Sequence, residues 1–284
     1  MRIAISAEST IDLPKELLEK YEIYIIPFTI ILGEETALDG EVDSKVLFDY
    51  TDKTGKLPKT SAVNEFQYQE YFESLKAKGY DAIIHYSLSS AISSACSNAK
   101  SAASKMENVF VIDTRSLSTG IALQAIAGRK LVEKGLSPKE IFEISEKRVS
   151  ACQASFSLES VNHLYKGGRC SLLSMLGANL LHIKPAIYVN AETGKMAPGK
   201  KKFRGSMMKA VMDYVEECLS LFPTPDKSLV FITYSSAPDD VVEAVRARLK
   251  EVGFETIYNT KAGATISCHC GPHCLGILYF NDGK

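Results

Sequence analysis

The sequence predicts an α/β protein with two domains, and three observations lead to this prediction. Short β-rich runs alternate with longer helical patterns, which is typical of βαβ units and a parallel sheet. The chain has 284 residues, more than a single domain usually contains. The pattern also changes near residue 150, where an edge-strand pattern and the pair Gly167-Gly168 follow a well-marked helix. We therefore expect one domain over residues 1–150 and a second over residues 151–284, packed closely together.

The N-terminal half contains compact apolar runs of the kind found in buried parallel strands. The strands predicted there are Arg2 to Ala7, Ile23 to Leu32, Asp81 to Tyr86 and Val109 to Asp113. A helix is expected over Pro14 to Tyr21. Another is predicted from residues that recur every three or four positions, namely Ile92, Ala95, Ala99, Ala102 and Met106. A third begins at Ser137, its N-cap, where Pro138 and Glu140 complete the start pattern.

The C-terminal half has more varied elements. Ala154 to Leu158 is predicted as an edge strand, and Leu172 to Leu181 as a short apolar helix. Glu192-Thr193-Gly194 is expected to be the turn of a hairpin. Longer helices are predicted over Ser206 to Leu221 and Asp239 to Val252. The remaining strands are expected at Ile183 to Val189, Leu229 to Tyr234, Glu255 to Asn259 and Leu275 to Phe280.

Charge and composition exclude several classes of function. The net charge is −1 and the only basic run is Lys200-Lys201-Lys202, so broad binding of nucleic acids or membrane surfaces is not expected. The N-terminus has too few apolar residues for a signal peptide, and no stretch reaches the roughly 18 apolar residues of a spanning helix. Seven cysteines, an odd number scattered along the chain, favour reduced thiols and a cytoplasmic location.

Hydroxyl groups gather in three segments beside predicted strands and helices. These segments are Glu8-Ser9-Thr10, Lys59-Thr60-Ser61 and the serine-rich run Ser87 to Ser94. Ligands of open α/β sheets lie beyond the carboxyl ends of the strands, and hydroxyls at a helix start suit an anion. For any single one of these residues, capping of the following helix is the more common role. Five serines in eight residues exceed what capping requires, so anion binding stays open beside it.

The segment CHCGPHC, Cys268 to Cys274, places five side chains that could bind a metal within seven residues. Structural zinc sites normally use two separated ligand pairs, which this chain lacks. His269 and His273 could share an ion only with help from a distant residue such as Cys170 or His182. We therefore expect no metal, and a turn that offers one imidazole to an anion. A metal-binding regulator is the alternative.

Seven short motifs, in the right order along the whole chain, resemble those of the DegV family. They are Glu8-Ser9-Thr10-Ile11-Asp12-Leu13, Pro58-Lys59-Thr60-Ser61, Ser89-Ser90-Ala91-Ile92-Ser93, Lys166-Gly167-Gly168-Arg169, Ile183-Lys184-Pro185, Lys202-Phe203-Arg204 and His269-Cys270-Gly271-Pro272. The resemblance implies a three-layer N-terminal domain with a parallel sheet and a C-terminal α/β sandwich with a mixed sheet. The chain departs from the family pattern at Ser94-Ala95 and at His273, so the geometry around the head group is left open.

The resemblance also implies a function. Members of the family hold a long-chain fatty acid between the two domains and present its carboxylate to a separate kinase. The residues implied to bind the carboxylate are Thr60, Ser61, Ser93, Ser94 and His269. Arg169 and Arg204 match arginines that meet the kinase. The acyl phosphate formed there would enter phospholipid synthesis, and transient contact with a membrane is compatible with this role.

An enzyme is the main rival to this binding function, because dihydroxyacetone kinases resemble the same fold. The sequence has neither a nucleotide-binding glycine loop in a suitable context nor a carboxylate cluster for Mg²⁺. We therefore expect a binding subunit without catalytic residues of its own and without a cofactor.

Overall fold

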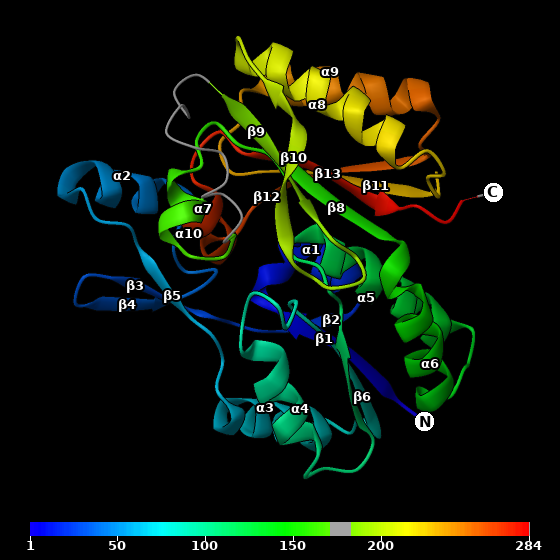
Figure 1. Cartoon of the computed structure of the whole chain (residues 1–284). Coiled ribbons are helices and arrows are strands. Elements are labelled where there is room, and N and C mark those ends of the chain that lie inside the picture. Colours follow the sequence, from blue (N-terminus) through cyan, green and yellow to red (C-terminus); the bar gives the residue numbers. More distant parts are fainter. Residues whose placement is uncertain (171–182, 284) are drawn as a thin grey trace.

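The computed structural model describes residues 1–170 and 183–283, which form two α/β units joined along one interface (Figure 1). In the first unit, a parallel sheet has the order β2-β1-β6-β7. Its strands are β1 (Ile3–Glu8), β2 (Ile23–Ile26), β6 (Ala82–Ser87) and β7 (Val109–Asp113). β1 and β6 lie in the centre and are buried along their whole length. This agrees with the apolar runs that predicted them.

Helices cover both faces of this parallel sheet, so the N-terminal unit has three layers. One layer holds α3 (Glu65–Ala77) and α4 (Ala95–Ala103), and the other holds α5 (Thr119–Glu133) and α6 (Pro138–Arg148). The small α1 (Lys15–Lys20) leads into β2. α6 starts with the predicted capping box, because the side chains of Ser137 and Glu140 each bond the other residue's backbone N–H. The expected helix around Ile92 to Met106 is present but shorter, and Ile92 lies in the loop before it.

A second, three-stranded sheet projects from the first unit, and it corrects one prediction. Its order is β4-β3-β5, with β3 (Thr29–Leu32), β4 (Glu35–Leu38) and β5 (Lys59–Ser61), and α2 (Ser44–Thr54) connects β4 to β5. The single strand predicted over Ile23 to Leu32 is therefore wrong. It is two strands in different sheets, separated at Pro27, which has no N–H to donate to a ladder.

The second unit is a six-stranded mixed sheet with helices on one face. The order is β10-β9-β8-β13-β11-β12, in which β11 and β12 run parallel and the other neighbours run antiparallel. The strands are β8 (Cys152–Ser157), β9 (Lys184–Val189), β10 (Met196–Phe203), β11 (Leu229–Tyr234), β12 (Thr256–Lys261) and β13 (Leu275–Phe280). The helices are α8 (Met207–Leu221) and α9 (Asp239–Val252).

β8 corrects a second prediction, because it is an interior strand between β9 and β13 and not an edge strand. Its polar residues Gln153, Ser155 and Ser157 are buried. Ser155 Oγ lies 2.8 Å from Tyr214 Oη of α8. The hairpin expected at Glu192-Thr193-Gly194 joins β9 and β10 as predicted.

The face of the mixed sheet that is not covered by α8 and α9 packs against α5, so this helix lies between the two units (Figure 1). α5 contacts β1 and β6 on one side and β8, β11 and β13 on the other. Every strand of the parallel sheet comes from before residue 150 and every strand of the mixed sheet from after it. The exact domain boundary near residue 150 stays a prediction.

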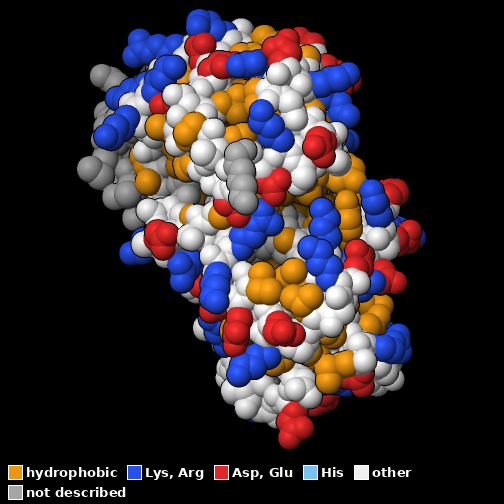
Figure 2. Space-filling model, turned by 90° about the vertical axis from the view of Figure 1, so that its right-hand side faces the viewer, with side chains coloured by type: hydrophobic (Ala, Val, Ile, Leu, Met, Phe, Trp, Pro, Cys, Tyr) orange, Lys and Arg blue, Asp and Glu red, His pale blue; other side chains and the backbone are white. Residues whose placement is uncertain are grey.

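Two short helices stand near the interface, α7 (Asn162–Lys166) and α10 (Ala264–Cys270). The helix expected over Leu172 to Leu181 lies outside the described residues. Within the described part, no helix combines the length and the hydropathy needed to span a bilayer. Acidic and basic side chains are intermingled on the face seen in Figure 2, which agrees with the net charge of −1.

Candidate functional site: a pocket between the two units

A pocket with a volume of about 260 Å³ lies between the two units and is lined from both. Much of its wall is apolar. The N-terminal unit contributes Phe28, Leu88, Ile92 and Leu117, and the C-terminal unit contributes Phe156, Leu164, Met196, Ile266 and Leu278. On β13, Gly276 and Leu278 face the pocket side, whereas Ile277 and Tyr279 belong to the core beneath α8 and α9. The alternation along a strand therefore separates the pocket from that core.

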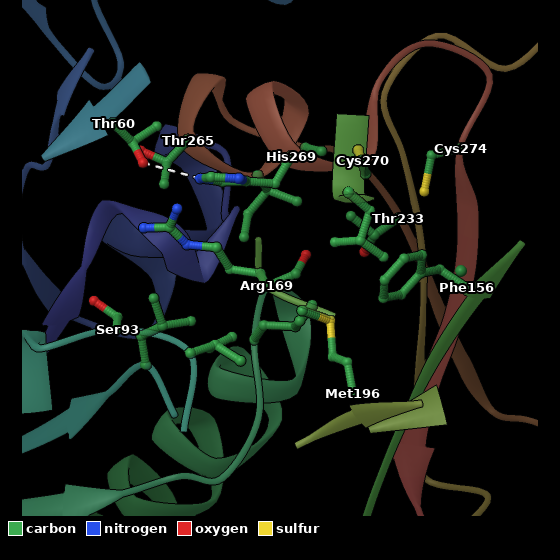
Figure 3. Close-up of a pocket in the computed structure, with 18 of the residues that line it drawn as sticks. Thr60, Ser93, Phe156, Arg169, Met196, Thr233, Thr265, His269, Cys270 and Cys274 are labelled. Atoms are coloured by element: carbon green, nitrogen blue, oxygen red, sulfur yellow. Dashed lines mark hydrogen bonds between the residues drawn. The ribbon is translucent and has the colours of Figure 1, made fainter. Parts of the chain in front are cut away.

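All five residues predicted to bind a head group line this one pocket. Thr60 and Ser61 come from β5, Ser93 and Ser94 from the loop before α4, and His269 from α10. Thr60 Oγ1 and His269 Nε2 form a hydrogen bond of 2.9 Å. Figure 3 shows this bond at one end of the pocket, with Ser93 on the opposite wall. Three segments that are distant in sequence thus gather hydroxyl and imidazole groups around one space.

His269 is held as a neutral imidazole near pH 7. Burial, together with the nearby positive charge of Arg169 and the ring of His163, lowers the pKa of His269 to about 4. Its Nδ1 atom is buried and has no hydrogen-bond partner among the described residues. A neutral imidazole can donate one hydrogen bond and accept another, so His269 can orient a bound anion without supplying a full charge.

Most hydroxyls of the serine-rich run Ser87 to Ser94 have structural partners. Ser87 donates to Glu8 at 2.5 Å, Ser89 to the Gly194 carbonyl at 3.0 Å, and Ser90 to Asp113 at 2.5 Å. Ser93 Oγ accepts from the N–H of Ala95 at 3.1 Å, which leaves its own hydrogen to be donated. Capping and anion binding were both left open for this run. Ser87, Ser89 and Ser90 therefore have structural roles, whereas Ser93 and Ser94 line the pocket.

A buried carboxylate fixes the loop that carries Ser93. Glu8 accepts hydrogen bonds from Tyr68 Oη at 2.6 Å and from the Leu88 N–H at 2.9 Å, and it lies 3.0 Å from His85 Nε2. Burial opposes ionisation of Glu8, but the interaction with His85 and the hydrogen bonds lower its pKa below the ordinary value. An ionised Glu8 thus ties the end of β6 to β1.

The two arginines that were predicted to contact a separate kinase, Arg169 and Arg204, lie in different places. Arg169 lines the pocket, and its guanidinium points toward the end where Thr60 and Ser93 lie (Figure 3). Its Nη1 donates to the Gly167 carbonyl at 2.7 Å. Arg204 is exposed after the end of β10 and does not line the pocket. The structure therefore brings Arg169 into the site and leaves Arg204 outside it.

Two buried aspartates, to which the sequence analysis gave no role, hold the start of α10. Asp12 accepts from the N–H of Gly263 at 2.8 Å, and Asp39 accepts from the N–H of Ala264 at 2.9 Å. Asp12 also accepts from Ser118 Oγ at 2.5 Å. These bonds join α10 to the N-terminal unit. Only the tertiary fold brings Asp12 and Asp39 together, although Asp12 belongs to one of the family-like motifs.

The side chains of the CHCGPHC segment do not converge on one point. α10 includes Cys268, His269 and Cys270, whereas His273 follows in the turn and is exposed. Cys268 packs with Ile30 in a small core, and Cys270 and Cys274 line the pocket. Over residues 1–170 and 183–283, no group of three or more His, Cys, Asp or Glu residues could hold a metal ion.

The comparison with known proteins gives the family. A family model described as an uncharacterised protein of the DegV family matches residues 2–282. The chain belongs to the DegV family. It is 28% identical over 284 residues to Protein DegV of Bacillus subtilis (strain 168), covering 98% of this chain and 99% of the relative. The resemblance inferred from the motifs is thus confirmed.

Solved structures of the family share the fold. The crystal structure of DegV, a fatty acid binding protein from Bacillus subtilis, matches with a TM-score of 0.84 and 27% identity, covering 99% of each chain. The Fatty Acid Kinase (Fak) B3 protein of Streptococcus pneumoniae, loaded with linoleic acid, matches with a TM-score of 0.84 and 21% identity, covering 99% of this chain and 100% of that one. The predicted α/β architecture is confirmed.

Proposed function

We propose that this DegV family protein binds a long-chain fatty acid in the pocket between its two units. The observation that carries the proposal is the shape of that site, a largely apolar pocket with Thr60, Ser93 and His269 at one end. An apolar cavity with a few converging polar groups is typical of a site for an amphipathic ligand. The Bacillus subtilis relative of the same fold is itself described as a fatty acid binding protein.

The acyl chain supplies most of the affinity in this proposal. Each buried CH₂ group contributes about 0.8 kcal/mol, so a tail of ~15 methylenes gains roughly 12 kcal/mol on transfer from water. The loss of translational and conformational freedom removes much of this gain. Hydrogen bonds to the carboxylate mainly offset its desolvation, so their net contribution is smaller than that of the tail, and they fix the orientation of the head group.

The head group lies, in this proposal, against Thr60, Ser61, Ser93, Ser94 and His269. The hydroxyl of Ser93 has a hydrogen to donate, and the guanidinium of Arg169 provides a positive charge at the same end. Donors that bond the ionised form favour a bound carboxylate over a carboxylic acid. Several orienting donors would hold the head group in one position.

The bound carboxylate is presented to a separate kinase that converts it to an acyl phosphate for phospholipid synthesis. The exposed Arg204, together with Arg169, provides the contact with this cytoplasmic partner. Support comes from the Streptococcus pneumoniae protein of the same fold, which carries the name Fatty Acid Kinase (Fak) B3 protein and is loaded with linoleic acid. The chain itself contributes binding and presentation, without a cofactor.

Extraction and transfer assays test the two halves of this proposal. Mass spectrometry of an organic extract from the purified protein should find a fatty acid at close to one molecule per chain. Addition of ATP should give acyl phosphate only when a fatty acid kinase subunit is also present. A protein that retains no fatty acid and binds none added would disprove the binding function. ATP turnover by the chain alone would disprove the proposal that a separate kinase subunit carries out the catalysis.

A further inference from the structure

We propose that Thr265 donates a hydrogen bond to the carboxylate of the bound fatty acid, beside Thr60 and His269. This inference rests on the proposed function and adds a specificity-determining residue to the head-group site. Thr265 lies on α10, four residues before His269, so both side chains project from the same side of the helix. Figure 3 shows Thr265 next to the Thr60–His269 pair.

The hydroxyl of Thr265 is buried but unpaired. The residue is 3% exposed, and its Oγ1 has no hydrogen-bond partner among residues 1–170 and 183–283. A threonine within a helix can bond the carbonyl four residues earlier. Thr265 is the second residue of α10, and the residue four positions earlier, Lys261, belongs to β12. The helix therefore offers it no such acceptor.

Other buried hydroxyls of the pocket wall are satisfied by the protein itself. Thr233 Oγ1 lies 2.6 Å from the hydroxyl of Thr119 and 2.9 Å from that of Thr260. Ser235 Oγ donates to the Gly271 carbonyl at 2.7 Å. Native proteins rarely leave a buried polar atom unpaired without a reason. A ligand oxygen at this end of the pocket gives Thr265 the acceptor that the fold does not supply.

A carboxylate oxygen is the acceptor that fits this position. The neighbouring groups are a hydroxyl, a neutral imidazole and the guanidinium of Arg169, all of which can donate a hydrogen bond. A hydrogen bond to an ionised acceptor is stronger than one to a neutral acceptor. Thr265 therefore favours the anion over an uncharged head group.

The test compares Thr265→Val with Thr10→Val. Valine has nearly the shape of threonine, so each variant removes only a hydroxyl. Thr10 is a matched control, because its Oγ1 is also buried and unpaired among the described residues, yet the residue does not line the pocket. We expect both fatty-acid-free variants to melt at or above the wild-type temperature. Thr265→Val should bind palmitate about tenfold more weakly, and Thr10→Val should bind it as the wild type does.

Each result separates this inference from the function on which it rests. Failure of the wild type to bind palmitate, or any other long-chain fatty acid, would remove the proposed function itself. Wild-type binding with an unchanged Thr265→Val affinity would overturn the role of Thr265 alone. Equal weakening by Thr265→Val and Thr10→Val would point to a loosened fold and would also overturn it. Thr265→Ser, which keeps the hydroxyl, should restore affinity to within about threefold of the wild type.

Discussion

At the scale of single residues, His269 couples the pocket to pH. Burial and the charge of Arg169 lower its pKa to about 4, whereas a histidine in the unfolded chain titrates near 6.5. Between these two values the unfolded chain binds a proton that the folded protein does not bind. Stability attributable to this residue is therefore complete above pH 6.5 and is lost as the pH falls toward 4.

We expect His269→Gln to flatten the pH dependence of stability over this window. Urea denaturation of fatty-acid-free protein at several values between pH 4.5 and 7 measures it. His273→Gln is the control, because His273 lies in the same segment but is exposed. Its curve should follow that of the wild type. Parallel curves for His269→Gln and the wild type would contradict the assignment.

Thr60 and Ser93 govern orientation more than occupancy in the proposed function. With fatty acid supplied in excess, Thr60→Ala combined with Ser93→Ala should therefore reduce acyl phosphate formation far more than it reduces the amount of fatty acid bound. The amount of fatty acid bound is measured by organic extraction, and acyl phosphate formation is measured by turnover with an added kinase. Ser90→Ala serves as the control, because Ser90 bonds Asp113 and lies outside the pocket lining. Equal loss of occupancy and turnover in the double variant would refute the separation.

The sequence could predict some of these residues and not others for a physical reason. Thr60, Ser93 and His269 lie in local motifs, each readable within a few positions. Thr265 is significant only because its hydroxyl is buried without a partner, which depends on neighbours from distant segments. Asp12 and Asp39 acquire their role in the same way, through the N-terminus of a helix that lies more than 200 residues away in the sequence.

At the scale of secondary structure elements, α10 depends on its buried carboxylates. Burial raises the pKa of Asp12 well above its ordinary value, and the charge of Asp39 raises it further, whereas the bonds from Ser118 and Gly263 lower it. The folded protein therefore holds a proton on Asp12 that the unfolded chain releases above pH 4. This difference makes the protein less stable as the pH rises above 4 toward the pKa of the folded state.

Asp12→Asn should consequently match or exceed the wild-type stability at pH 8. Asparagine can still accept from the Gly263 N–H, and its amide can donate to Ser118. Asp12→Ala loses both bonds and should cost about 1–3 kcal/mol of unfolding free energy. Urea denaturation at pH 5 and pH 8 distinguishes the two variants. An asparagine variant as unstable as the alanine variant at pH 8 would show that the charge itself is required.

Two helices that the sequence failed to predict, α5 and α10, depend on tertiary contacts more than on a local sequence pattern. α5 lies between two sheets, and its first six residues are all buried, so no amphipathic pattern marks that part of it. α10 is rich in Thr, Ser, Cys and His, which have modest helix propensity, and it is held at its start by Asp12 and Asp39. β6 and β7 were predictable because buried parallel strands carry continuous apolar runs.

At the scale of the whole molecule, α5 packs between the sheets of the two units. The helix follows Leu117 and Ser118, which line the pocket, and its glycines allow close approach on both sides. A Cβ atom on Gly120 would lie 2.0 Å from Ser116 Oγ and 3.4 Å from Cys152 Sγ of the C-terminal sheet. A Cβ atom on Gly128 would lie 1.9 Å from Tyr86 Oη of the N-terminal sheet.

Gly128→Ala should therefore destabilise the protein, although alanine favours a helix by about 1 kcal/mol over glycine. Overpacking in a closed core costs about 1–3 kcal/mol, and Tyr86 is fully buried and bonded to Ser145 Oγ at 2.8 Å, so it has little room to move. Tyr86→Phe removes the oxygen atom that a new methyl group would meet first. In a double-mutant cycle followed by urea denaturation, Gly128→Ala should cost less in the Tyr86→Phe background than in the wild type. An equal cost in both backgrounds would mean that the contact between α5 and Tyr86 of the N-terminal sheet does not limit this position.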